Sequence, residues 1–278
     1  MPVNAQRLIR KMRGGAQAHL LECDDGHYYV VKFVNNPQHR RILINELISS
    51  RFLQFLDISV PQVAVVNLTP EFLRETPEIF LQLGHHRLAV EPGWHFGSCY
   101  PGDPARVTVY DFLPDVLLDK VENLQQFCGV LAFDKWMGNA DARQAIFFRA
   151  RLKKHGADAP ARMGFVAEMM DHGYVLNGPH WTFVDSPLQG LYFRPQVYRQ
   201  VHSYDDFQPW LDRIMHFPEE IVDQTLKQIP SQWMAGDEAA LEKLLIALLG
   251  RCKQVPRLIK ETQGGRVNAF PGWSRSGV

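Results

Sequence analysis

Residues 18–34 read AHLLECDDGHYYVVKFV, two β-rich runs on either side of an Asp-Gly turn. This pattern predicts a β-hairpin, because Asp-Gly adopts the tight turns that connect antiparallel strands. After Asn35-Asn36-Pro37 the pattern changes, and apolar residues recur at helical spacing. That spacing predicts an amphipathic helix over residues 40–56. The chain therefore begins with a β-rich region that carries one long helix.

The remaining elements extend outward from this region. Leu113-Pro114 ends a run of strand-forming residues, and helical periodicity dominates after it. Residues 69–83 have a mixed pattern, which we interpret as a helical or irregular insertion. The other predicted elements are strands at 63–66, 106–112, 145–148 and 164–170, helices at 123–137 and 241–252, and a loop at 138–141.

These elements predict an α+β protein with two lobes. The first lobe, residues 1–111, is β-rich and contains the long helix, and the second, residues 112–261, is mostly helical. Residues 262–278 are rich in Gly, Ser and Arg and have no periodicity, so we expect a mobile tail.

The composition excludes several classes of protein. Of 278 residues, 46% are hydrophobic and 22% charged, which is typical of a globular protein and not of a disordered or fibrous one. Thirty Lys and Arg residues balance thirty Asp and Glu residues, so net charge indicates neither a nucleic-acid nor an anionic-membrane partner. The four cysteines form no C-x-x-C pair, and no uncharged stretch could cross a membrane. We therefore expect a cytoplasmic protein.

Two features of the first lobe could bind phosphate groups. Gly14-Gly15-Ala16-Gln17 precedes the first strand of the hairpin, where backbone N–H groups can approach phosphate oxygens closely, although a glycine pair is also an ordinary turn. Lys32 lies within the apolar run Val30–Val34 and is either a snorkelling edge residue or a cation directed into a cleft. Glu46 shares a helix face with Ser49 and Ser50 and could pair with Lys32, or could lie on the surface.

Two carboxylates follow apolar elements in the second lobe. Asp141 follows the helix at 123–137, and Asp171 follows the strand at 164–170. A general base and a metal ligand that converge on one site would have this arrangement. Hydrolytic enzymes also use paired carboxylates, so the pair alone does not decide the reaction.

In combination, these motifs resemble the HipA-like kinases. The sequence has Gly15-Ala16-Gln17, the lysine of Val30-Val31-Lys32-Phe33, Asn45-Glu46, Gly138-Asn139-Ala140-Asp141 and Asp171-His172-Gly173 in that family's order. The resemblance implies a bilobal protein-kinase-like fold that uses ATP and Mg²⁺. It also implies a role for each motif. Gly14, Gly15, Ala16 and Gln17 would form the phosphate loop, Lys32 would contact phosphates, Glu46 would orient Lys32, Asp141 would be the catalytic aspartate, Asp171 would bind magnesium, and Tyr110, Asp111 and Phe112 would form the hinge beside adenine.

The sequence departs from this pattern in two places. Kinases usually carry a magnesium-binding Asn five residues after the catalytic Asp, and Ile146 stands there. Gln144 and Asn139 are the nearby oxygen donors that could replace it as metal ligands, and the second metal would then be weaker or absent. HipA-like toxins commonly carry an additional N-terminal subdomain, whereas few residues precede Gly14 here, so an antitoxin partner is not assumed.

We therefore predict an ATP- and Mg-dependent phosphotransferase that acts on a Ser or Thr hydroxyl of a protein substrate. Two alternatives stay open. One is a nucleotide-binding pseudokinase that serves as an interaction module, which Ile146 favours. The other is a kinase for a small-molecule or lipid hydroxyl, since that reaction requires the same catalytic residues.

Overall fold

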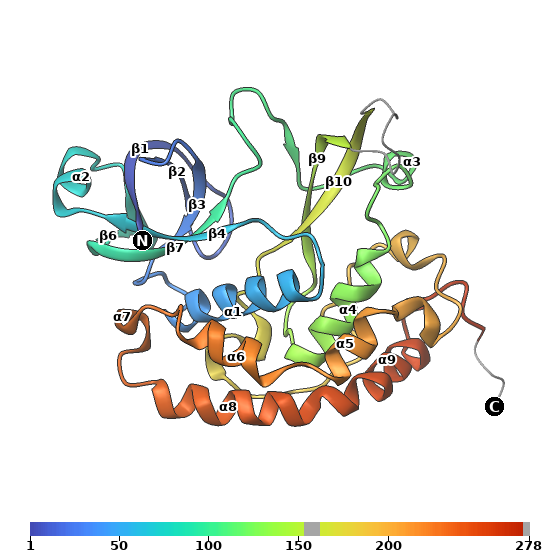
Figure 1. Cartoon of the computed structure of the whole chain (residues 1–278). Coiled ribbons are helices and arrows are strands. Elements are labelled where there is room, and N and C mark those ends of the chain that lie inside the picture. The colour runs from blue at the N-terminus through green and yellow to red at the C-terminus, as the bar shows by residue number, and fades with distance from the viewer. Residues whose placement is uncertain (153–161, 275–278) are drawn as a thin grey trace.

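In the computed structural model, which describes residues 1–152 and 162–274, the first lobe is built around a closed five-stranded β-barrel (Figure 1). The barrel order is β1 (Val3–Lys11), β2 (His19–Cys23), β3 (Tyr28–Lys32), β7 (Gly93–Cys99) and β4 (Val63–Leu68). The predicted hairpin is present, with Leu20 opposite Val30 and Leu21 opposite Tyr29. Leu21 and Val31 are fully buried inside this lobe.

Strand β1 was not predicted, although it closes the barrel. It pairs antiparallel with β2 and parallel with β4. Its register with β2 shifts between Ala5 and Arg7 and again between Leu8 and Arg10. Such bulges interrupt the alternation of apolar and polar side chains, and that alternation is the sequence signal for a strand.

The long predicted helix is α1 (Arg41–Phe55), and it lies between the barrel and the helices of the second lobe (Figure 1). Eleven of its 15 residues are buried, among them Asn45, Glu46, Ser49 and Ser50. A helix buried on one face would keep such polar residues in water. Because α1 lies between the two lobes, these polar residues are enclosed by protein on both sides of the helix.

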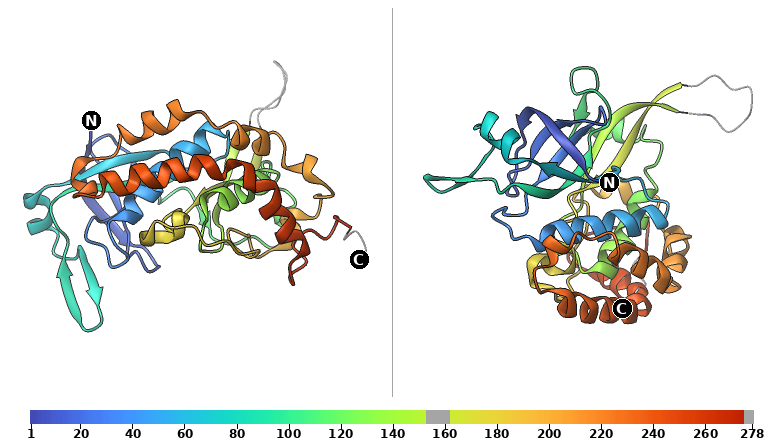
Figure 2. Two further views of the ribbon diagram at one scale, coloured as in Figure 1. Left: turned by 90° about the horizontal axis from the view of Figure 1, so that it is seen from below. Right: turned by 60° about the vertical axis from the view of Figure 1, so that its left-hand side comes forward.

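An insertion between β4 and β7 projects from the barrel (Figure 2). It contains α2 (Pro70–Glu75), which begins at Thr69, whose side chain accepts a hydrogen bond from the Phe72 N–H. A two-stranded hairpin of β5 (Phe80–Leu83) and β6 (His86–Ala89) follows. The prediction of a helical or irregular segment over 69–83 thus included the helix and missed the hairpin.

The second lobe contains a three-stranded sheet in the order β10, β9, β8. Strand β9 (Gln144–Leu152) pairs antiparallel with β10 (Arg162–Met170) along its whole length. The strand predicted over 106–112 is reduced to β8 (Val109–Tyr110), which pairs with β9. The division between the lobes at residue 112 stays a prediction. Strand β8 precedes that residue and already pairs with β9 in the sheet of the second lobe.

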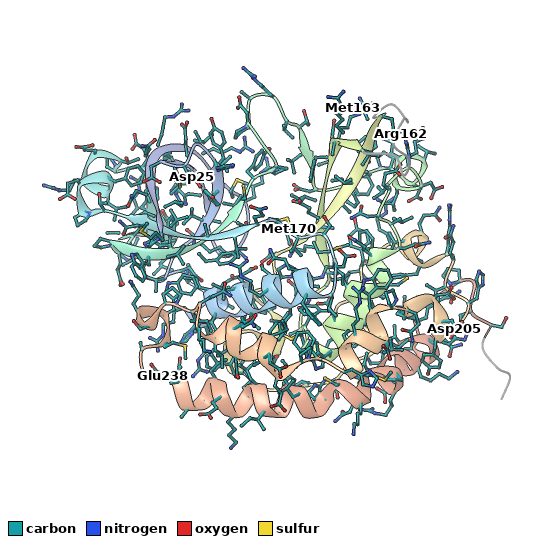
Figure 3. The ribbon with its side chains drawn as sticks, viewed as in Figure 1. Asp25, Arg162, Met163, Met170, Asp205 and Glu238 are labelled. Carbon is teal, nitrogen blue, oxygen red and sulfur yellow. The ribbon has the colours of Figure 1, made fainter. Side chains whose placement is uncertain are left out.

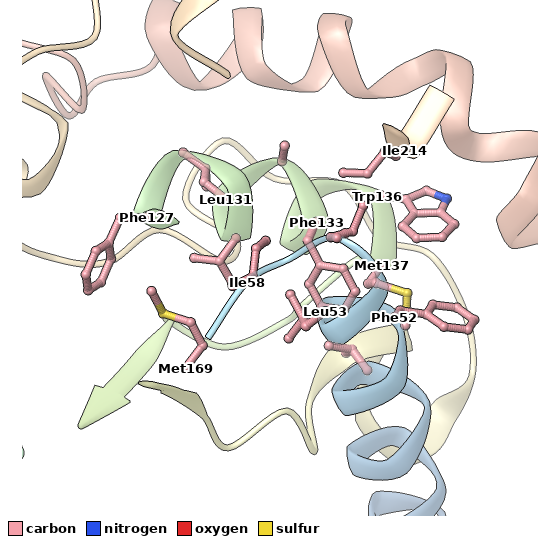
Figure 4. Packing of buried hydrophobic residues seen from close by; sticks show 14 of the residues in the cluster. Phe52, Leu53, Ile58, Phe127, Leu131, Phe133, Trp136, Met137, Met169 and Ile214 are labelled. Carbon is pink, nitrogen blue, oxygen red and sulfur yellow. The ribbon is translucent and has the colours of Figure 1, made fainter. Parts of the chain in front are cut away.

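Helices make up the remainder of the second lobe. They are α3 (Asp115–Leu118), α4 (Gln126–Met137), α5 (Trp210–Met215), α6 (Glu219–Leu226), α7 (Ser231–Met234), α8 (Glu238–Arg251) and α9 (Val255–Gly264), with four short 3₁₀ turns, Val175–His180, Pro195–Tyr198, Tyr204–Phe207 and Cys252–Gln254. In the core, Phe52 of α1 stacks on Trp136 of α4, with 5.7 Å between ring centroids (Figure 4). Among the described residues, no helix is long and apolar enough to cross a membrane.

The end of the chain packs more closely than the sequence predicted. Residues 275–278 of the expected tail lie outside the described residues. Before them, Ala269 and Phe270 are each 1% exposed, and the Phe270 ring meets Tyr198 edge to face at 5.7 Å. Burying an aromatic side chain contributes about 2 kcal/mol, enough to hold a segment that has no periodicity.

Candidate active site

A cleft of about 660 Å³ brings most of the predicted site residues together. It lies between the barrel and the sheet of the second lobe, where Figure 3 labels Met170 as one of its lining residues. The predicted residues that line it are Gly14, Gly15, Ala16, Gln17, Lys32, Asp111, Asp141, Gln144 and Asp171. Glu46 lies behind Lys32 as a buried partner, and Asn139, Tyr110 and Phe112 are not part of the lining.

Lys32 joins three elements that are distant in sequence. From β3, its ammonium forms an ion pair with Glu46 of α1 and another with Asp171, 2.6 Å from Oδ1, at the end of β10. Lys32 and Glu46 are buried, whereas the Asp171 side chain is 33% exposed. Lys32 and Asp171 both line the cleft, and Asp171 is the more exposed of the two.

The charges of this triad depend on one another. Burial opposes the charge of Lys32, but the carboxylates of Glu46 and Asp171 outweigh that effect and raise the pKa of Lys32. Burial also raises the pKa of Glu46, against the attraction of Lys32. The pKa of Asp171 is lowered, mainly by Lys32, with help from Arg143 and the side chain of Gln144. The carboxylate that faces the cleft thus stays ionised.

The backbone at Asp171 has an unusual conformation. Its φ is +57°, in the left-handed region that non-glycine residues seldom adopt. Gly173 follows, and a Cβ there would lie 2.6 Å from the Ile42 side chain of α1. Such strain persists where surrounding contacts enforce it, and it concentrates at functional sites.

Asn45 forms several of the contacts that hold the segment after Asp171 in place. Its side-chain amide donates to the carbonyl oxygens of Gly173, Val175 and Gly178 at 2.8, 3.1 and 3.0 Å. Its Oδ1 accepts from the Trp181 indole N–H at 2.9 Å. Asn45 therefore ties α1, which carries Glu46, to the chain that follows Asp171. No role was predicted for it, although Asn45-Glu46 was one of the motifs that carried the resemblance to the HipA-like kinases.

Asp141 lies in an ordered loop that begins where α4 ends. Gly138 ends the helix with φ +62°, and Asp141 Oδ1 accepts from the Ala142 N–H at 2.7 Å. Asn139 is 1% exposed, donates to Asp134 and accepts from the Asp141 N–H. The prediction of Asn139 as a metal ligand stays a prediction; in this structure its amide forms hydrogen bonds within the loop, and the residue does not line the cleft.

A second buried ion pair, which was not predicted, supports both aspartate loops. Arg143 pairs with Asp134, and both side chains are fully buried. The guanidinium also donates to the Met170 carbonyl and contacts His172 Nδ1, each at 2.9 Å. Arg143 therefore connects the segment after Asp141 with the segment around Asp171. Asp134 and Arg143 could not be paired from sequence, because nothing local indicates that both turn inward.

The predicted phosphate loop connects β1 with β2. Gly14 has φ +117°, which favours glycine, and its carbonyl accepts from the Gln17 N–H at 3.1 Å. The Gln17 side chain is engaged elsewhere: its amide donates to the Gln82 carbonyl, and its Oε1 accepts from the Gln82 N–H. Backbone groups of this loop, and not the Gln17 side chain, are therefore the donors that could meet phosphate.

Of the three predicted hinge residues, Asp111 lines the cleft, and the hinge itself stays a prediction. Tyr110 and Phe112 are 38% and 59% exposed, and their rings pack near Phe165 and beneath Arg194. Neither Tyr110 nor Phe112 lines the cleft.

Ile146 and Gln144 occupy different environments on β9. Ile146 is 8% exposed and does not line the cleft, whereas Gln144 is exposed and does. Of the two predicted replacement ligands, Gln144 is therefore the one that lines the cleft.

Comparisons with known proteins identify the fold and the family of this chain. No curated protein sequence matches the chain. Two solved structures match its fold, a crystal structure of the Golgi casein kinase with Mn/ADP bound and another of the Golgi casein kinase, each with TM-score 0.53 and 14% identity. The first match covers 100% of this chain and 77% of that structure, and the second covers 95% of this chain and 75% of that structure. The predicted bilobal kinase-like α+β fold is thereby confirmed.

The sequence comparison identifies the family. The family model for HipA-like kinases matches residues 5–146, about half of the chain. The matched part includes the glycine loop, Lys32, Glu46 and Asp141, and it ends before Asp171. The chain therefore belongs to the HipA-like kinases and is a kinase-type phosphotransferase.

Proposed function

We propose that this protein transfers the terminal phosphoryl group of ATP, with Mg²⁺, to a Ser or Thr hydroxyl of a protein. The observation that carries the proposal is the Lys32–Glu46–Asp171 triad, which faces a cleft shared with Asp141 and the glycine loop. Phosphoryl transfer needs a cation on the phosphates, backbone donors around them, a metal ligand and a carboxylate for the acceptor hydroxyl. One cleft supplies a residue for each task.

The nucleotide would span the cleft between the lobes. The phosphates would lie beneath the N–H groups of residues 14–17 and within reach of the Lys32 ammonium. Tyr110, Asp111 and Phe112 would form the hinge beside the base, with Asp111 lining the cleft. The Golgi casein kinase with the same fold was solved with Mn/ADP bound, which supports the use of a nucleotide and a divalent ion.

The residues present fit a magnesium ion that is bound mainly through the nucleotide. Among the described residues, no group of three or more His, Cys, Asp or Glu side chains could hold a metal. The partly exposed Asp171 carboxylate and the Gln144 amide oxygen are hard donors of the type that Mg²⁺ prefers. Mg²⁺ is commonly held by one or two carboxylates together with substrate phosphates. When bound, the ion would neutralise charge on the phosphates.

Asp141 would serve as the base. The acceptor oxygen forms a bond to the terminal phosphorus, the bond between that phosphorus and the bridging oxygen breaks, and ADP leaves. The hydroxyl proton passes to the Asp141 carboxylate. Because Oδ1 of Asp141 accepts from the Ala142 N–H, the carboxylate is oriented by its own loop before substrate arrives.

The test compares the intact protein with Asp141→Asn in a cell lysate, with labelled ATP and saturating magnesium. We expect labelled protein only with the intact enzyme, while the variant still binds ATP. Asp205→Asn, an exposed carboxylate of the second lobe outside this cleft, is the matched control and should transfer label normally. Equal transfer by Asp141→Asn would remove the role assigned to Asp141. If only small molecules or lipids are labelled, the acceptor hydroxyl belongs to a compound of that class and not to a protein.

The second candidate is a nucleotide-binding pseudokinase. It is favoured by Ile146, which cannot bind a cation and stands where kinases usually have a metal-binding Asn. ATP binding without transfer by the intact protein would establish this candidate. The experiment above therefore separates the two functions.

A further inference from the structure

A group of unpaired cations lies on the lip of the cleft. Arg10 and Lys11 end β1, Arg13 follows in the glycine loop, and all three are exposed and line the cleft. Arg87, on β6, is also exposed; it does not line the cleft itself but adjoins Lys11 at the Phe80 ring. Within residues 1–152 and 162–274, no carboxylate forms an ion pair with any of these four. We call Arg10, Lys11, Arg13 and Arg87 the cationic lip.

Two members of the lip share one aromatic ring. The Lys11 ammonium lies 3.0 Å from the centroid of the Phe80 ring, and the Arg87 guanidinium carbon lies 4.3 Å from it. Lys11 also donates to the Phe80 carbonyl at 3.3 Å. Partial burial and the charge of Arg87 lower the pKa of Lys11. Two like charges held together without a carboxylate repel each other, and a bound anion would relieve that repulsion.

The lip is held in a defined place by the β5–β6 hairpin. Gln17 and Gln82 exchange two hydrogen bonds, of 2.8 and 2.6 Å, between the glycine loop and β5. With the Lys11 contacts to Phe80, these bonds attach the projecting hairpin to the loop (Figure 2). The cations of the lip are therefore presented by two elements that are fastened to each other.

We propose that the cationic lip binds the acceptor, and that the acceptor is a protein segment with acidic residues flanking its Ser or Thr. This inference rests on the proposed kinase function. The inner cleft carries Asp111, Asp141 and Asp171, which repel an acidic segment. A positive lip on the same cleft offsets that repulsion and leaves the uncharged hydroxyl as the part that reaches Asp141. The nucleotide phosphates already have Lys32 and the loop N–H groups.

The experiment uses the full chain and two synthetic peptides that differ only in Asp or Gln around one Ser. We expect the intact enzyme to prefer the acidic peptide in kcat/KM, and Lys11→Gln with Arg87→Gln to reduce this preference about tenfold, since two exposed charge contacts are lost. The preference should also weaken with added salt. Lys243→Gln, an exposed lysine of α8, is the matched control and should retain the preference.

Three results would overturn the inference. An intact enzyme without preference for the acidic peptide would do so, as would a double variant that retains the preference. If the double variant loses as much affinity for ATP as for the acidic peptide, the cationic lip binds the nucleotide and not the acceptor. If the intact protein binds no ATP, the proposed function fails separately. Fluorescence anisotropy of the acidic peptide then tests the lip, and equal binding to the intact protein and the double variant would overturn it.

Discussion

Two buried charge clusters meet near Asp171, and they differ in one respect. In the first, Lys32 contacts Glu46 and Asp171, and the Asp171 side chain is 33% exposed to the cleft. In the second, Asp134 and Arg143 are completely buried. A ligand can therefore compete for Asp171 but cannot reach Asp134. The first cluster is suited to binding, and the second holds the loops that present it.

The pKa shifts follow the same division. Lys32 lowers the pKa of Asp171, so this carboxylate stays ionised where it faces the cleft. Burial raises the pKa of Asp134 even though Arg143 opposes the shift. The charge of Asp134 thus depends on a partner that no solvent can replace. The open cluster of Lys32, Glu46 and Asp171 should therefore tolerate loss of a partner better than the closed pair of Asp134 and Arg143.

The largest expected loss of stability comes from breaking the closed cluster. Arg143→Leu would leave the Asp134 carboxylate buried without its cation, and we expect the free energy of unfolding to fall by about 3–5 kcal/mol. Urea unfolding followed by circular dichroism measures the change. Asp134→Leu combined with Arg143→Leu should recover more than half of the loss, because no unpaired charge remains. A single variant as stable as the intact protein would contradict the role of this pair.

The next effect tests the connection between α1 and the Asp171 loop. Asn45→Ala would leave three carbonyl oxygens and the Trp181 N–H without their partner, and we expect a loss of about 3 kcal/mol. More magnesium should then be needed for ATP binding, since Asp171 loses its support. Titration calorimetry of the folded variant measures this requirement.

Ser49→Ala is the matched control for this experiment. Ser49 is fully buried on the same helix, and its hydroxyl has no hydrogen-bond partner among the described residues. We expect a change in stability below about 1 kcal/mol and an unchanged magnesium requirement. A purely structural Asn45 would lower stability without altering that requirement.

Breaking the open cluster should cost less stability and more function. Lys32→Met leaves Asp171 able to meet water and Glu46 able to bind a proton, so we expect a loss of about 1–2 kcal/mol. ATP binding should weaken by at least about tenfold, because the cation for the phosphates is gone. Calorimetry and urea unfolding give the two values. A loss of stability as large as that of Arg143→Leu would break the comparison.

The smallest effect concerns Glu168 on β10, whose side chain forms no hydrogen bond or ion pair with the described residues. Burial raises its pKa from 4.5 to about 7. The folded protein therefore holds this proton more tightly than the unfolded chain, and the stabilisation is lost as pH rises from 4.5 through about 7. The full shift would correspond to roughly 3 kcal/mol, and because the side chain is only half-buried we expect Glu168→Gln to remove about 1–2 kcal/mol of this pH dependence. Glu242→Gln, on the exposed face of α8, should keep it.

Much of the local structure could be predicted because its signals lie within short windows. The hairpin at 18–34 has the turn residues that its conformation needs, and helix α1 was predicted from apolar residues at helical spacing. The helix is present, but it is buried on most of its surface and is not amphipathic as predicted. Strand β1 and the β5–β6 hairpin were missed. The first is interrupted by register shifts, and the second is mostly exposed, with Leu81 its one fully buried residue, so too few side chains face inward to set an alternating pattern.

The candidate site shows the same limit. Lys32, Glu46, Asp141 and Asp171 stand out because each follows or interrupts an apolar run. Asn139 stood out equally, yet its amide is used inside the loop by Asp134 and the Asp141 N–H. A polar residue beside a catalytic aspartate has the same local signal whether it binds a ligand or shapes the turn.

The kinds of element and the order of the chemical groups follow from the amino-acid sequence alone, because period, turn residues and charge are local properties. The packing of the two lobes is needed to enclose α1, to place Asn45 against the segment after Asp171, and to turn Arg143 inward to Asp134. These contacts join residues far apart in the chain. Their stability comes from burial, where an unpaired charge or amide costs several kcal/mol, and burial exists only once the lobes have packed.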